Sequence, residues 1–144
     1  MTGHPNPALR QLAMRALAQR KGSAASAAAL AAAAQRAYDD LTRVSAPLIG
    51  DVGVNALTGR TLYLAQRQYP WVVHAREPEE WNGPFEQIVF CLERQDPAVA
   101  TEAAGAVLTT LAGLLVTFIG EPLTVHLLRQ AWPDAFADAN MEER

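Results

Sequence analysis

The sequence contains few of the residues that build disulfides, metal sites and basic binding surfaces. It has one cysteine (Cys91), one lysine (Lys21) and three histidines among 144 residues. A single cysteine excludes an internal disulfide and a multi-cysteine zinc site, and no two histidines have the spacing of a helical zinc motif. The net charge of −3 gives no overall positive field to attract nucleic acid. We therefore expect no metal, no cofactor and no nucleic-acid partner.

The composition is that of one folded domain. Half of the residues are hydrophobic and 19% are charged, which is too apolar for a disordered chain. We expect a single helical domain over residues 1–144, with a flexible start at 1–6 and an acidic tail at 134–144. Alanine is abundant and arginine almost replaces lysine, a bias typical of GC-rich bacterial genes. The start lacks the apolar core of a secretion signal, so we expect a bacterial, cytoplasmic protein.

Apolar residues recur at helical spacing, which predicts an all-α fold. Leu48 and Leu123 fall on the apolar sides of their helices. Gly53 and Gly59 weaken the third helix, so we expect them to allow close contact with a neighbour such as the alanine-rich face of 24–34. Capping residues, prolines and glycines bound the expected helices, which are 7–21, 23–46, 51–69, 84–92, 96–119 and 121–132.

The segment 96–119 is the most apolar of these helices, and residues 103–120 carry no charge. The stretch 103–120 has the minimum length for a membrane span, but it contains three threonines and has an acid next to each end, which argues against insertion. We expect the helix 96–119 to be the buried centre of a compact bundle of five or six helices. Such a helix needs cover on all sides, and a homodimer would supply that cover.

Four aromatic residues surround the irregular segment 70–84: Tyr69, Trp71, Trp81 and Phe85. A loop of this length in a compact domain is often functional, and clustered aromatic side chains are typical of interface hot spots and small-ligand pockets. They also suit the end of a bundle, because tryptophan and tyrosine favour places that are half apolar and half wet. We treat these four residues as interface or pocket candidates.

The last predicted helix carries a histidine with a basic residue at helical spacing. His126 lies on the polar side of that helix with Arg129 three residues later, so we expect it to be at least partly exposed. The string 126–130 resembles the phosphorylatable segment of histidine phosphotransfer domains, in which a lysine at this spacing balances the charge of the phosphoryl group. Arg129 stands where that family has lysine, and Gln130 where it has glycine. The resemblance implies phosphoryl transfer through His126 and Arg129.

No set of residues forms a recognisable catalytic centre, so we expect a non-catalytic helical interaction or regulatory module rather than an enzyme. It would bury apolar helix surface against a copy of itself, as a homodimer, or against another protein. Residues 1–38 contain no acid while 133–144 are acidic, so the two ends could attract each other across a dimer. The alternatives are phosphotransfer, a small-ligand domain with an aromatic pocket, and DNA binding by the helices at 23–46 and 51–69.

Overall fold

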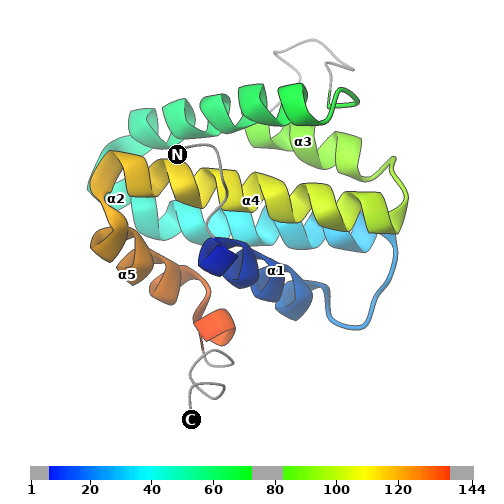
Figure 1. Ribbon diagram of the computed structural model, residues 1–144, viewed down its shortest axis with the longest axis horizontal. Coiled ribbons are helices and arrows are strands. Elements are labelled where there is room, and N and C mark those ends of the chain that lie inside the picture. Colours follow the sequence, from blue (N-terminus) through cyan, green and yellow to red (C-terminus); the bar gives the residue numbers. More distant parts are fainter. Residues whose placement is uncertain (1–6, 73–82, 137–144) are drawn as a thin grey trace.

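α-Helices make up all regular structure in residues 7–72 and 83–136, the two parts of the chain that the computed structural model describes. The expected all-α bundle around the apolar helix is confirmed (Figure 1). The loop expected at 70–84 lies mostly outside the described residues. The helices are α1 (Pro7–Lys21), α2 (Ala27–Gln68), α3 (Pro84–Leu92), α4 (Pro97–Ile119) and α5 (Glu121–Ala131).

Helix α2 consists of two segments that meet at Gly50. This glycine has φ 80° and ψ 162°, a left-handed φ that residues with a Cβ rarely adopt. The second segment runs back along the first (Figure 1), and the hydroxyl groups of Tyr38 and Thr58 share a hydrogen bond of 2.8 Å between them. The predicted break between two helices is therefore confirmed, although the first segment continues through Pro47 to the corner.

The start of α2 differs from the prediction. The first residue of the helix is Ala27 rather than Ser23. Ser26 is the N-cap, and its hydroxyl accepts a hydrogen bond of 3.0 Å from the backbone N–H of Ala29. Gly22 ends α1 with φ 66°, so the chain needs several residues to turn before it can begin another helix. Both serines can cap a helix, and the room required by this turn selects the later one.

Helix α4 lies at the centre of the bundle and contacts all four other helices. It is long and apolar enough to cross a membrane by length and composition alone, and half of its most apolar stretch is buried inside the bundle. The described residues of one chain therefore cover α4 only in part, and the cover expected from a second copy stays a prediction. Helix α4 lies toward the viewer in Figure 1, and its exposed large hydrophobic residues are Val99 near one end and Phe118 near the other.

The close helix contact is made by a different glycine from those predicted. A Cβ on Gly59 would meet nothing within 4 Å, and one on Gly53 would meet only the side chain of Ile49, 3.2 Å away in the same helix. The expected approach of these two glycines to the alanine-rich face is therefore wrong. Gly105 of α4 lies against Met14 of α1, and a Cβ there would overlap the methionine sulfur. Gly105 thus lets α1 approach α4.

Candidate functional site

A charged hollow of about 400 Å³ opens between α1, α2 and the chain that follows α5. It holds three acids and two arginines, so it is the first place to look for polar chemistry. Its lining residues are Gln19, Arg20, Arg36, Asp39, Asp40, Pro133 and Asp134.

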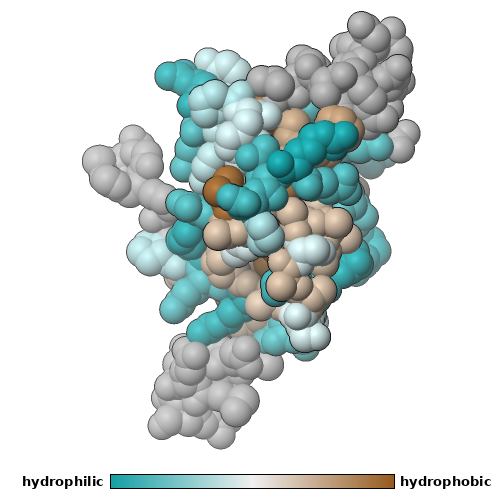
Figure 2. Space-filling model, turned by 90° about the vertical axis from the view of Figure 1, so that its right-hand side faces the viewer, coloured by the Kyte–Doolittle hydropathy of each residue, from teal (hydrophilic) through white to brown (hydrophobic). Residues whose placement is uncertain are grey.

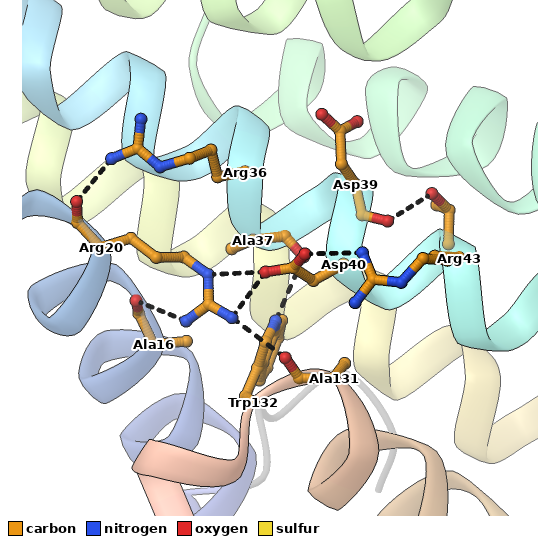
Figure 3. Close-up of polar contacts among 10 residues, drawn as sticks. Ala16, Arg20, Arg36, Ala37, Asp39, Asp40, Arg43, Ala131 and Trp132 are labelled. Carbon is orange, nitrogen blue, oxygen red and sulfur yellow. Dashed lines mark hydrogen bonds and ion pairs between the residues drawn. The ribbon is translucent and has the colours of Figure 1, made fainter.

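Arg20 donates its side-chain hydrogen bonds to acceptors within the bundle (Figure 3). Its Nε and Nη2 donate to Oδ2 of Asp40 at 3.0 and 2.7 Å. Nη1 donates to the carbonyl oxygen of Ala16 at 3.2 Å, and Nη2 also donates to that of Ala131 at 3.0 Å. One guanidinium group therefore joins the end of α1, the middle of α2 and the end of α5.

Asp40 is held in its charged form by the same contacts. Burial raises the pKa of this carboxyl, but hydrogen bonds from Arg20 and Arg43, together with their positive charges, outweigh burial and lower the pKa below its usual 3.8. Beside this pair, the fully buried Trp132 donates from Nε1 to the carbonyl oxygen of Ala37 at 3.1 Å. These contacts connect helices within the chain, and we call Arg20, Asp40, Ala131 and Trp132 the clamp.

A second hollow, of about 280 Å³, lies between α2 and the start of α3 and is lined partly by Tyr38 and Phe85. Their rings stack with centroids 4.1 Å apart and planes 5° from parallel. Burial, and to a lesser extent the charge of Asp39, raises the pKa of Tyr38 above 10.0, against the opposing effect of its hydrogen bond with Thr58. Stacking and the hydrogen bond thus fix the phenol between the two segments of α2 and α3.

The predicted aromatic candidates separate into different environments. Tyr69 and Trp71 are partly buried and contact each other, with ring centroids 5.5 Å apart. Burial raises the pKa of Tyr69, and the charge of Glu102 raises it further. Phe85 is buried and stacks on Tyr38 instead, a partner that sequence spacing did not suggest. Trp81 lies outside the described residues. Of the four, the described contacts therefore bring together Tyr69 and Trp71.

The phosphotransfer candidates lie on α5. His126 is exposed, as its position on the polar side predicted. Arg129 places its guanidinium 4.6 Å from the centre of the Phe136 ring, which is within cation–π range. Arg20, in the basic first part of the chain, also reaches the end of α5 through its hydrogen bond to the Ala131 carbonyl oxygen, and the expected attraction across a dimer stays a prediction. The acidic tail from residue 137 lies outside the described residues.

The two sharp corners of the bundle repeat one local pattern. Residues 48–51 and 118–121 each read as a bulky apolar residue, isoleucine, glycine and an acid. Gly50 and Gly120 both have left-handed φ, 80° and 93°, and each corner leads into a new helical segment. Both corners lie at the same end of the bundle, on the left of Figure 1. A small apolar gap there is bordered by Ile49 and by two leucines of α4, which places the first corner against the last part of that helix.

Large apolar side chains project into solvent at both corners. Val52 is 84% exposed and Leu48 50% at the first, and Phe118 is 60% exposed and Leu123 37% at the second. Periodicity predicted Leu48 and Leu123 to face inward, and the corners turn them outward because the helix axis changes direction there. We call these four residues, with the exposed acids Asp51 and Glu121 between them, the corner face.

Unlike Asp40, the two acids of the corner face make no ion pair among the described residues. Within residues 7–72 and 83–136, neither Asp51 nor Glu121 has an ion-pair partner. Arg43, eight residues before Asp51, pairs with Asp40 at 2.9 Å. Arg129, eight residues after Glu121, lies over Phe136. Each acid begins a helical segment, where a negative charge is favourable, and each carboxylate remains exposed to a partner.

The opposite end of the bundle has a different surface (Figure 2). Pale brown patches and smaller dark brown ones lie there among hydrophilic side chains. The chain at the start of α2 contributes exposed alanines such as Ala25 and Ala28, and the α3–α4 connection contributes the exposed Glu93, Arg94 and Asp96. Alanine offers little area to bury, and Val99 at this end, 39% exposed, is less exposed than Val52 or Phe118 at the corners.

Among the described residues, no group of three or more histidine, cysteine, aspartate or glutamate side chains is placed to hold a metal ion. Comparison with known proteins gives no relative: no family model matches the chain, and no curated protein or solved structure is significantly similar to it. The repeated corner pattern is visible in the sequence, but only the fold shows that both copies lie at one end with their bulky residues outside.

Proposed function

We propose that this chain is a non-catalytic helical interaction module that binds another protein chain, a second copy or a different protein, through the corner face. The observation that carries the proposal is the exposure of Val52 and Phe118, at 84% and 60%. Exposed large apolar groups that gather in one region are typical of protein contact sites, whereas single scattered ones need no explanation.

The contrast with the rest of the surface supports this choice. Two of the six exposed large hydrophobic residues, Tyr63 and Val99, lie away from the corners, and the other four belong to them. The arginines Arg60 and Arg67 both lie over the ring of Tyr63, 5.3 and 5.8 Å from its centre, so that side chain is already partly covered. Neither hollow offers comparable apolar surface, because charged or hydrogen-bonded side chains line both.

The proposal is tested with the double variant Val52→Ser, Phe118→Ser and the matched control Val99→Ser. Val99 is 39% exposed near the far end of α4. It lies 19 residues before Phe118, which is about 28 Å along the helix at 1.5 Å per residue. Self-association is measured by light scattering, and binding of proteins from the native host by affinity capture followed by titration of each captured protein. We expect the corner variant to lose the contact and the control to keep it. Contacts that survive unchanged in the corner variant would contradict the proposal.

A further inference from the structure

The charges of the corner face select one kind of partner. We infer that the corner face binds a protein segment that presents apolar side chains flanked by arginine or lysine, rather than a second copy of itself. This inference rests on the proposed function and adds the chemistry of the partner.

Both acids of the corner face lie close in sequence to its exposed apolar residues. Asp51 lies directly before Val52, and Glu121 lies between Phe118 and Leu123, so each exposed acid is within three residues of an exposed apolar anchor along the chain. A partner that buries the anchors must approach both carboxylates. Cations at the edge of its contact surface would then pair with charges that already stand exposed, and complementary charge of this kind sets specificity and the rate of association.

The chain on either side of each corner carries no lysine or arginine. Residues 44–59 and 95–128 contain no arginine or lysine. The nearest arginines along the chain, Arg43 and Arg129, are directed to Asp40 and Phe136. The corner face therefore presents two negative charges without a positive charge from the flanking chain.

These charges count against two other occupants. A symmetric contact between two corner faces would bring the acids of both copies together without cations to balance them, and like charges at an interface are costly. A bilayer with anionic lipids would repel the same carboxylates, since surface binding of this kind depends on lysine and arginine. A partner with basic residues around an apolar centre meets neither obstacle.

The experiment uses the full chain and two synthetic helical peptides of equal length. One has leucine on one face and lysine on the other, and its match has glutamate in place of lysine. Fluorescence anisotropy measures binding of each peptide at about 50 mM and about 300 mM salt, because exposed charge pairs weaken as the screening length falls. Light scattering of the protein alone and co-sedimentation with vesicles containing phosphatidylserine test the other two occupants.

Three variants connect any binding to the corner face. Val52→Ser with Phe118→Ser removes two anchors, and Asp51→Asn with Glu121→Gln removes both charges. Glu93→Gln with Asp96→Asn is the charge-matched control, since both residues are exposed at the other end of α4. Circular dichroism confirms that each variant is folded, so that a loss of binding is not a loss of structure.

We expect the lysine peptide to bind at least about tenfold more tightly than the glutamate peptide at low salt. Neutralising Asp51 and Glu121 should weaken its binding about three- to tenfold and remove most of the salt dependence, since each exposed pair contributes modestly. The control pair should change affinity less than about twofold, as distant surface charges are largely screened. The anchor variant should lose binding of the lysine peptide.

Some results would contradict the basic partner alone, and others would contradict the proposed function as well. Equal affinity for both peptides, or no effect of neutralising the acids, would overturn the basic partner. A dimer lost in the anchor variant, or vesicle binding lost in it, would also overturn the basic partner. The dimer would leave the proposed protein contact standing, whereas vesicle binding would replace it. If the anchor variant bound peptides and itself as the wild type does, both the inference and the proposed function would fail.

Discussion

The clamp and the corner face both present charged groups at the surface, but the fold uses their charges differently. Arg20 donates to Asp40 and to the carbonyl oxygens of Ala16 and Ala131, and Asp40 also pairs with Arg43. Asp51 and Glu121 have no such partners in the described parts of the chain. A charged hollow holds helices together when its charges pair within the fold. Exposed charges near apolar anchors can instead pair with a partner.

The largest expected effect comes from removing the centre of the clamp. Arg20→Ala removes two hydrogen bonds from Asp40, which keeps Arg43, and takes this donor from the Ala131 carbonyl oxygen, so we expect the free energy of unfolding to fall by about 2–3 kcal/mol. Urea denaturation followed by circular dichroism measures this change. Arg60→Ala, an exposed arginine over Tyr63, is the control and should change stability by less than about 0.5 kcal/mol. Equal losses in the two variants would remove the distinction between clamp and surface.

The clamp also predicts a dependence on acid. Because the pKa of Asp40 is lowered in the folded state, its contribution is complete above the unfolded value of about 3.9 and is lost as the pH falls through the folded pKa. We expect Asp40→Asn to be less stable than wild type at pH 7 by about 1–2 kcal/mol. The difference in the free energy of unfolding between the variant and the wild type should narrow below about pH 4. Denaturation curves across this range measure it, and a gap that widens in acid would contradict the ion pair.

A buried polar group without a partner gives a contrasting prediction. Nε2 of Gln87 is buried and has no hydrogen-bond partner within the described parts of the chain, unlike the hydroxyl of Thr58, which donates to the Val54 carbonyl oxygen at 2.9 Å. We expect Gln87→Leu to leave stability unchanged or raise it by up to about 1 kcal/mol, and Thr58→Val to lower it by about 1 kcal/mol. Thermal melting compares the two, and a larger loss in Gln87→Leu would show that the amide has a partner.

The smallest expected effects on stability belong to the corner face. Val52 and Phe118 are largely exposed, so replacing both by serine should change the free energy of unfolding by less than about 0.5 kcal/mol. The same should hold for His126→Gln on the exposed side of α5. Urea denaturation of these variants beside Arg20→Ala completes the comparison. A loss of more than about 2 kcal/mol in the serine variant would mean that the corner residues hold the bundle together.

The helices could be predicted because their signals are local. Apolar spacing located the apolar core helix, and Gly22, Gly50 and Gly120 marked the ends of helical segments where the structure places left-handed glycines. The first residue of a helix was harder to predict. Ser23 and Ser26 can both act as N-caps, and only the path of the chain between α1 and α2 selects Ser26.

The tertiary contacts could not be predicted in the same way. Arg20 and Asp40 are 20 residues apart and Ala37 and Trp132 are 95 apart, and no spacing rule connects such pairs before the helices are placed. Leu48 was misassigned to the interior for a related reason. Helical periodicity assumes one straight axis, and the corner at Gly50 turns that leucine outward.

Hydrogen–deuterium exchange of the whole chain, with and without the lysine-bearing peptide or an identified partner protein, tests the central claim most directly. We expect slower exchange at residues 48–52 and 118–123 in the complex, because binding buries the corners. We expect no change around Arg20 and Asp40, because their side chains are already hydrogen-bonded within the fold. Slower exchange around the clamp, with unchanged exchange at both corners, would contradict binding through the corner face.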